Sequence, residues 1–445
     1  MDGIFNHLEA TAEAWMSRCT SCGKCVEACP TAGQIKLDKT RSAEIAGQLI
    51  ALTRGAPDAP EAVQWINACN GSGNCSAVCP ESINVRQWVG IERLRRRLAQ
   101  VPNDDRIAAA QKKFRTMSHS VRLLASMQVP SDALDRITRA RRDRPADLVF
   151  YTGCNVLRTP HLVFNVMDIL DGLGLDYEVM GGAGHCCGVY HFHEGDLPAY
   201  ERVAGNTYDA FAKVGAKRVL TWCPSCTKQF GEVWHDYAKP DFEMGHVTKF
   251  LVEQLDRIRA AFKGELPRQR VAIHEHEGIA GVAESVATLL RAMPNVELVE
   301  IAQERGYGYT CGGPAARHPE HERALHARVA ATAAVAQVDV LVTLYHACHR
   351  ALSGAEAVYP FAVKNFTDLL AEALGIGGRH DYYKQYKRGG EMDEAIAAAK
   401  TYLAENGVTL DEATVKALTA EIFNETGIAG DRADFEAVFT ALVRR

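Results

Sequence analysis

The sequence has no long apolar run and no large excess of charge of either sign. None of its segments reaches the stretch of about eighteen apolar residues that a membrane-spanning helix requires. The first residues also lack the basic and apolar regions of a secretory signal. A formal net charge of −5 over 445 residues argues against a protein that binds nucleic acid through its overall charge. We therefore expect a cytoplasmic protein whose membrane association, where it occurs, comes through a partner.

A nucleotide-binding loop is missing as well. No Gly-x-Gly-x-x-Gly motif follows an expected strand, so nothing indicates that the chain itself binds a flavin or a nicotinamide. Hydride chemistry is therefore expected on another protein.

Cysteine, by contrast, is abundant. Fourteen cysteines in a chain without an export signal indicate metal ligands in a reducing compartment. The first run places Cys19, Cys22 and Cys25 at three-residue spacing, followed by Cys29 and Pro30. This spacing is typical of a cubane iron–sulfur cluster, in which the fourth cysteine serves a second cluster. A structural zinc site is the alternative.

A second run repeats the first with one ligand changed. Cys69, Cys75 and Cys79 keep their positions, but Ser72 replaces the second cysteine. If ligands cross over as in two-cluster ferredoxins, one complete [4Fe–4S] cluster is held by Cys19, Cys22, Cys25 and Cys79. The other site has only the thiolates of Cys29, Cys69 and Cys75. It favours a [3Fe–4S] cluster, or a [4Fe–4S] cluster whose odd iron takes Ser72 oxygen or solvent.

Short apolar strands alternate with helical segments from Ala146 onward, which predicts βαβ units with parallel strands. The buried-strand candidates are 147–152, 218–222, 270–273 and 338–343. Each leads into a cysteine or another reactive residue, as expected for a site at the carboxyl ends of the strands. Earlier in the chain, 42–52 and 83–97 have helical periodicity.

A third group of cysteines follows these strands: Cys154, the adjacent pair Cys186 and Cys187, and then Cys223 and Cys226. Adjacent cysteines do not both face one corner of a cubane cluster, so the pair implies an unusual cluster. A disulfide-prone pair and a structural zinc site are the alternatives.

With this signature, residues of about 10 to 370 resemble the proteins with the cysteine–cysteine–glycine domain. These include heterodisulfide reductase subunits and the iron–sulfur subunits of glycolate, glycerol-3-phosphate and lactate oxidation systems. The resemblance implies that a noncubane [4Fe–4S] cluster is held by Cys154, Cys186, Cys187, Cys223 and Cys226. The order of the parts resembles the fused D-type subunit of heterodisulfide reductase.

The family usually has two such domains, and the second is degenerate here. Internal repeats align Glu277, Thr310 and Tyr345 with three of the five cysteines, so no second noncubane cluster is expected. Two functions remain open for this half. One is a residual zinc or iron site drawn from His276, Glu277, Cys311, Cys348 and His349. The other is a substrate or quinone pocket, in which His274 and His346 would deliver protons to a reacting substrate. A vestigial lobe whose polar residues cap strand ends is the third possibility.

The expected fold is α/β with all-α parts. It combines a helical two-cluster ferredoxin-like N-terminal domain, two βαβ cysteine–cysteine–glycine lobes and a helical C-terminal tail. The expected boundaries are 1–100 for the ferredoxin-type domain, 101–145 for a helical linker, 146–265 for the intact lobe, 266–376 for the degenerate lobe and 377–445 for the tail.

The resemblance implies an iron–sulfur electron-transfer subunit. It would relay electrons between a flavin-bearing dehydrogenase or electron-transfer flavoprotein and a quinone or membrane partner. The alternative is a heterodisulfide reductase-like enzyme that reduces a disulfide at the noncubane cluster. A non-redox scaffold is disfavoured, because twelve of the fourteen cysteines lie in ligand patterns.

Overall fold

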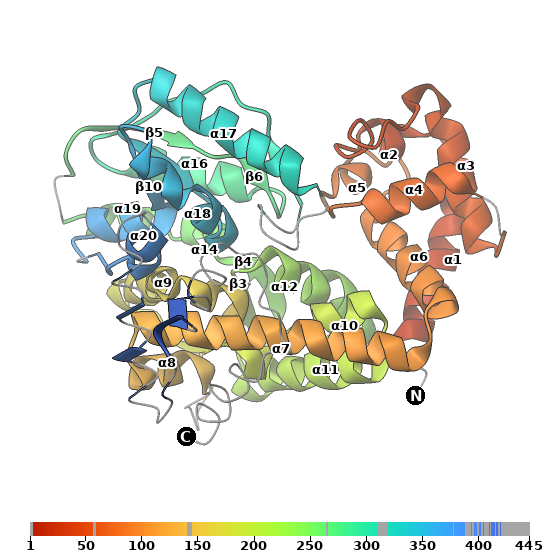
Figure 1. Cartoon of the computed structure of the whole chain (residues 1–445), viewed down its shortest axis with the longest axis horizontal. Helices are drawn as coiled ribbons and strands as arrows, with labels where there is room; N and C mark the ends of the chain where they lie inside the picture. The colour runs from red at the N-terminus through yellow and green to blue at the C-terminus, as the bar shows by residue number, and fades with distance from the viewer. Residues whose placement is uncertain are drawn as a thin grey trace.

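The computed structural model has three parts: a helical N-terminal part and two lobes, each built on a four-stranded sheet (Figure 1). It describes residues 3–56, 59–139, 145–263, 266–308, 311, 318–376, 378–387 and single positions between 393 and 419. Among these residues no helix is both long and apolar enough to cross a membrane. The expected mixture of α/β and all-α parts is confirmed.

The N-terminal part is helical because its apolar side chains recur at helical spacing around a core that includes Trp65 and Trp88. Its helices are α1 (Ile4–Arg18), α2 (Lys24–Glu27), α3 (Ser42–Thr53), α4 (Pro60–Ala68), α5 (Asn74–Ala77) and α6 (Val85–Gln100). The helices expected over 42–52 and 83–97 are therefore confirmed as α3 and α6.

The helix α7 (Asn103–Gln128) runs along the first lobe (Figure 1). Asp104 and Asp105 in its first turn complement the helix dipole. The Phe114 ring lies 5.4 Å from the His191 ring, and the Gln128 side chain donates a 2.9 Å hydrogen bond to the Arg158 carbonyl. The segment therefore packs on the first lobe over its length and continues into α8 (Ser131–Thr138).

The first lobe contains a parallel sheet in the order β2-β1-β3-β4. The strands are β1 (Leu148–Gly153), β2 (Tyr177–Gly181), β3 (Arg218–Thr221) and β4 (Glu243–His246). The helices of the lobe are α9 (Pro160–Gly172), α10 (Val189–Glu194), α11 (Leu197–Val214), α12 (Pro224–Lys228), α13 (His235–Ala238), α14 (Val247–Glu253) and α15 (Leu255–Ala261).

The second lobe has the same topology, with its parallel sheet in the order β10-β9-β5-β7. Its strands are β5 (Gln269–Ile273), β7 (Val296–Leu298), β9 (Val340–Thr343) and β10 (Ala362–Asn365), and β6 (His276–Glu277) pairs with β8 (Gly306–Tyr307). Its helices are α16 (Val282–Ala292), α17 (Pro319–Val335), α18 (His346–Leu352) and α19 (Phe366–Ala373), followed by α20 (Tyr382–Lys387). In both sheets the first strand is central and the second and third flank it, which confirms the internal repeat.

All four expected strands are present, as β1, β3, β5 and β9, whereas their neighbours gave no sequence signal. The segment that forms β2 includes a buried Glu178, and β4 ends in a buried His246, so neither segment is a continuous apolar run. The linker residues 140–144 lie outside the described part of the chain. The same holds for most of the expected helical tail beyond Lys387.

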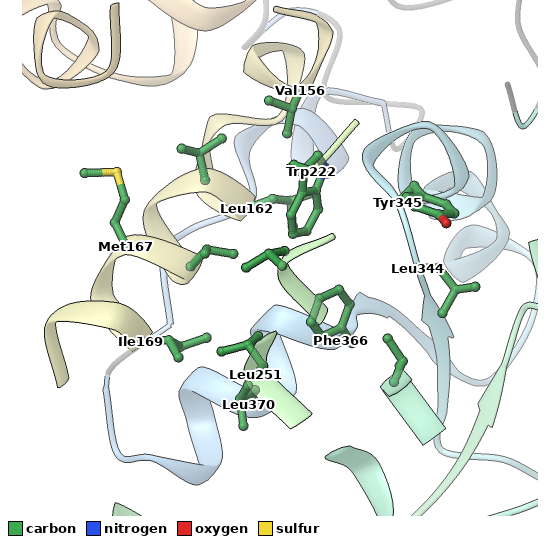
Figure 2. Packing of buried hydrophobic residues seen from close by; sticks show 14 of the residues in the cluster. Val156, Leu162, Met167, Ile169, Trp222, Leu251, Leu344, Tyr345, Phe366 and Leu370 are labelled. Atoms are coloured by element: carbon green, nitrogen blue, oxygen red, sulfur yellow. The ribbon is translucent and has the colours of Figure 1, made fainter. Parts of the chain in front are cut away.

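The two lobes share one apolar core. Trp222, at the end of β3, stacks on Phe366 at the start of α19, with 5.8 Å between the ring centroids. Figure 2 shows both rings between Leu162 of the first lobe and Leu344 of the second. The indole nitrogen of Trp222 also donates a 3.2 Å hydrogen bond to Nδ1 of His346.

Because Trp222 is almost fully buried in this shared core, Trp222→Ala should lower the free energy of unfolding by about 3–5 kcal/mol. Anaerobic urea unfolding of the intact protein would measure this loss. Trp222→Phe, which keeps a stacking ring, should lose less. Trp15→Ala, at a partly exposed residue, is the control. If Trp222→Ala lowered the free energy of unfolding no more than Trp15→Ala does, the shared core would not hold the lobes together.

Candidate functional site

The two ferredoxin-type loops interleave their cysteines. Burial raises the pKa of the Cys19 thiol, and the nearby Cys79 and Cys22 raise it further. Burial and the charge of Cys19 likewise raise the pKa of Cys25 to about 12. The structure thus gathers Cys19, Cys22, Cys25 and Cys79, the set expected for the complete cluster.

The remaining three thiols of the ferredoxin-type part form the second set. Burial raises the pKa of Cys75, and the charges of Cys69 and Cys29 raise it further. The Gly71 amide donates a 3.4 Å hydrogen bond to the Cys69 sulfur. The Ser72 hydroxyl accepts a hydrogen bond of 3.4 Å from the Asn74 amide within the same loop.

Local backbone geometry places the central cysteine of each loop. Gly23 and Gly73 have φ values of 78° and 88°, and a four-residue helix starts directly after each. Cys25 and Cys75 lie at the second position of these helices. A Cβ on Gly23 would lie 2.5 Å from the Ala43 amide nitrogen, so only glycine fits there.

The first lobe brings all five of its cysteines together at the carboxyl ends of the strands. Hydrogen bonds between thiols connect Cys154 to Cys186, Cys186 to Cys187, Cys187 to Cys226 and Cys226 to Cys223. All five are buried. Hydrogen bonds from Cys154 and Cys187, joined by one of 3.4 Å from the Gly188 amide, hold the pKa of Cys186 well below its ordinary value.

These donor sets fit iron–sulfur clusters. None of the fourteen cysteines, all within the described residues, forms a disulfide. Several thiolates buried together repel one another and have lost their water, so they need a bound cation to be stable. The cluster assignments themselves remain predictions.

Gly153 is a residue of this site that the sequence analysis missed. Its φ is 76°, and an added Cβ would lie 3.0 Å from the Cys226 sulfur. Gly188, which the Cys-Cys-Gly motif does point to, has φ 72°, and its added Cβ would meet the Tyr200 ring at 2.8 Å. Gly153 therefore lets the backbone after β1 approach the sulfur atoms.

Comparison with known protein families agrees with this geometry. Residues 15–83 match the family model of the 4Fe-4S dicluster domain, and residues 148–231 match that of the cysteine-rich domain known as CCG. The chain thus contains a 4Fe-4S dicluster domain and a cysteine–cysteine–glycine domain. The expected resemblance is thus confirmed for these two domains, whose matched ranges contain twelve of the fourteen cysteines. No curated protein matches the chain.

The second lobe does not gather the five residues proposed for a residual metal site. Cys311 lies between two imidazoles, 3.2 Å from Nε2 of His274 and 3.0 Å from Nε2 of His326. His326, on α17, was not among the sequence candidates. His276 instead lies 3.2 Å from the Gly308 carbonyl, and Cys348 is buried in the core. The side chain of Glu277 and the whole of Thr310 lie outside the described residues.

His349 belongs to a different group. Its Nε2 lies 2.6 Å from a carboxylate oxygen of Asp381, and His161 lies 3.6 Å from the other oxygen. Burial raises the pKa of Asp381, but the charges of His161 and His349 outweigh burial and hold it well below the ordinary value. This group fixes the segment before α20 against α9 and α18.

The two histidines expected to deliver protons are buried. Burial holds the pKa of His274 and that of His346 well below the ordinary value, so both rings are neutral near pH 7. His346 already accepts a hydrogen bond from Trp222. This environment favours a role in packing and positioning over one as a cationic acid.

Gly153→Ala should remove the first-lobe cluster selectively, with a loss of about four irons per chain, because its methyl group would press on the Cys226 sulfur. Iron analysis of anaerobically purified protein measures this loss. Gly174→Ala is the matched control, since Gly174 has φ 62° but open space around its added Cβ. Equal iron in the two variants would contradict the account.

His246 should make stability depend on pH. Its Nε2 lies 2.9 Å from the carbonyl of Trp222, the residue before Cys223, and its Nδ1 lies 2.9 Å from the Thr248 hydroxyl. Burial lowers the pKa of His246 to about 4 from an ordinary 6.5. Below pH 6.5 the unfolded chain binds a proton that the folded chain excludes, so stability falls between pH 6.5 and 4, by up to about 3 kcal/mol.

The measurement is the unfolding temperature across this pH window. His246→Gln cannot take up the proton, so its unfolding temperature should fall less than that of the unaltered protein. An identical fall in the unfolding temperature of both proteins would show that the folded state does not keep His246 unprotonated.

Proposed function

We propose that the protein is an electron-transfer subunit that carries electrons between a flavin-bearing dehydrogenase or electron-transfer flavoprotein and a quinone or membrane acceptor. The observation that carries the proposal is the direct contact between the three-cysteine loop and the first-lobe cysteine site. When bound, the clusters would supply one-electron redox chemistry. The residues of the chain then have to hold the three sites in one connected path.

Lys228 makes the main contact on this path. It lies two residues after Cys226, and its ammonium donates a hydrogen bond to the carbonyl of Gly71, two residues after Cys69. Because Lys228 is buried, this contact is shielded from water. The Gly71 carbonyl in the three-cysteine loop is thus hydrogen-bonded to α12, the helix that begins after Cys223 of the first-lobe site.

A second set of contacts fixes the same interface. Arg86 of α6 forms an ion pair with Glu232, and its charge opposes in small part the rise that burial causes in the pKa of Cys75. Gln87 donates a 3.1 Å hydrogen bond to the Glu232 carbonyl, and Asn84 donates one of 3.2 Å to its carboxylate. These contacts therefore fix the position of the three-cysteine loop relative to the first lobe.

The first set of cysteines continues the path on the other side. Cys25 of the complete set contributes to the raised pKa of Cys75, so the two ferredoxin-type sets are neighbours. The order is then the complete ferredoxin-type set, the three-cysteine set and the first-lobe set. A path in this order supports a relay.

Burial supports the relay over disulfide reduction. Cys186 and Cys187 are each only 1 % exposed, and Cys223, the most exposed of the five, is 8 % exposed. A disulfide substrate has to reach a sulfur or iron directly, whereas electron transfer between clusters needs no opening for a substrate. The heterodisulfide reductase-like alternative therefore has less support from the geometry.

Low-temperature electron paramagnetic resonance on anaerobically purified protein tests the proposal, with iron counted in the same sample. We expect a [3Fe–4S] signal in the oxidised protein, a [4Fe–4S] signal after reduction and about eleven irons per chain. A cluster signal that appears only after a disulfide or thiol is added would favour the reductase. Zinc in place of iron would contradict both functions.

A further inference from the structure

We propose that the second lobe binds a divalent metal ion of the zinc class through His274, Cys311 and His326, with its fourth coordination position open to a pocket. This site lies outside the three cluster sites of the relay and does not depend on them.

The three ligand atoms converge as a metal site requires. They lie within 4.8 Å of one another, and the Cys311 sulfur is 3.2 Å from Nε2 of His274 and 3.0 Å from Nε2 of His326. Zinc–nitrogen and zinc–sulfur bonds of about 2.0 and 2.3 Å at tetrahedral angles separate such atoms by roughly 3.5 Å. Both sulfur–nitrogen distances fall short of this separation by about half an ångström or less.

Hydrogen bonds alone satisfy these three side chains poorly. A thiol carries one proton, so Cys311 can donate to only one of the two imidazole nitrogens that face it. The other ring would have to turn an N–H toward the same sulfur. A metal ion accepts a lone pair from all three atoms at once, and one thiolate with two imidazoles is a donor set that zinc prefers.

The backbone around His274 is held independently of any ion. The His274 amide donates a 2.8 Å hydrogen bond to the Val342 carbonyl on β9. The Gln303 amide group spans the same turn, donating to the Ile273 carbonyl at 2.7 Å and accepting from the Glu275 amide at 3.0 Å. The backbone that carries this ligand is thus fixed before metal binding, which lowers the cost of ordering the site.

A small pocket is lined by all three ligands, by other residues of the second lobe and by residues of the ferredoxin-type part. Its lining includes His276 and Tyr307 from the second lobe and Pro30 and Asn70 from the two cluster loops. The Asn70 side chain donates a 3.2 Å hydrogen bond to the Tyr307 carbonyl, which closes one side of the pocket.

Among the described residues no fourth ligand atom joins these three, so the position on the pocket side is left for an outside ligand. A site with three protein ligands and a free fourth position binds water or a small ligand, as catalytic zinc sites do, whereas structural sites use four protein ligands. The ion would therefore be exchangeable and accessible from the pocket.

Metal analysis of the full chain, purified anaerobically with its clusters, tests the site. Zinc is expected at about one equivalent per chain, and Cys311→Ser and His326→Gln should each lose most of it while the iron content and the cluster resonance signals stay unchanged. After removal of the zinc with a chelator, cobalt should restore a thiolate-to-cobalt charge-transfer band in the unaltered protein and not in Cys311→Ser.

Two variants serve as matched controls. Cys348→Ser alters the other cysteine of the lobe, and His321→Ala alters a pocket-lining histidine on the same helix as His326. Both should keep the zinc and the cobalt band. The proposal is overturned if the unaltered protein binds neither metal at this stoichiometry, if Cys311→Ser and His326→Gln bind as well as the unaltered protein, or if the controls lose as much metal as the ligand variants.

Discussion

The central contact in this protein is the hydrogen bond from Lys228 to the carbonyl of Gly71 in the three-cysteine loop, supported at the same interface by the ion pair of Arg86 with Glu232. Lys228 belongs to the first lobe, Gly71 belongs to the ferredoxin-type part, and the Lys228 charge also contributes to the low pKa of His276 in the second lobe. Asn70, the neighbour of Gly71, is bonded to Tyr307 of the second lobe. The loop with the missing cysteine is therefore the point at which all three parts meet.

The two lobes show how one topology can carry different chemistry. Parallel strands in the same order end at the same edge in both sheets, so the side chains that follow them converge whatever their type. In the first lobe these side chains are five thiols. In the second lobe the equivalent edge carries His274 and Cys311, joined by His326 from a helix. The change of residues alters the donor atoms at each edge and leaves the topology of the sheet intact.

Local features of the sites could be predicted from the sequence, and long-range ones could not. The spacing around Cys25 and Cys75 determines a tight loop within a few residues, and β1, β3, β5 and β9 are continuous apolar runs. The place of His326 depends on how α17 packs against β5, more than fifty residues away in the chain. The bond between Lys228 and Gly71 likewise depends on the docking of two parts. Gly153 gave no signal, because its role is to leave space for Cys226.

A redox titration followed by electron paramagnetic resonance tests the central contact most directly. Loss of the Lys228 charge in Lys228→Met should lower the reduction potential of the three-cysteine cluster, by roughly tens of millivolts, because a nearby cation favours the reduced, more negative cluster. Lys217→Met, which removes an exposed lysine of the same lobe, should leave this potential unchanged. An unchanged potential in Lys228→Met, or equal shifts in the two variants, would contradict the account.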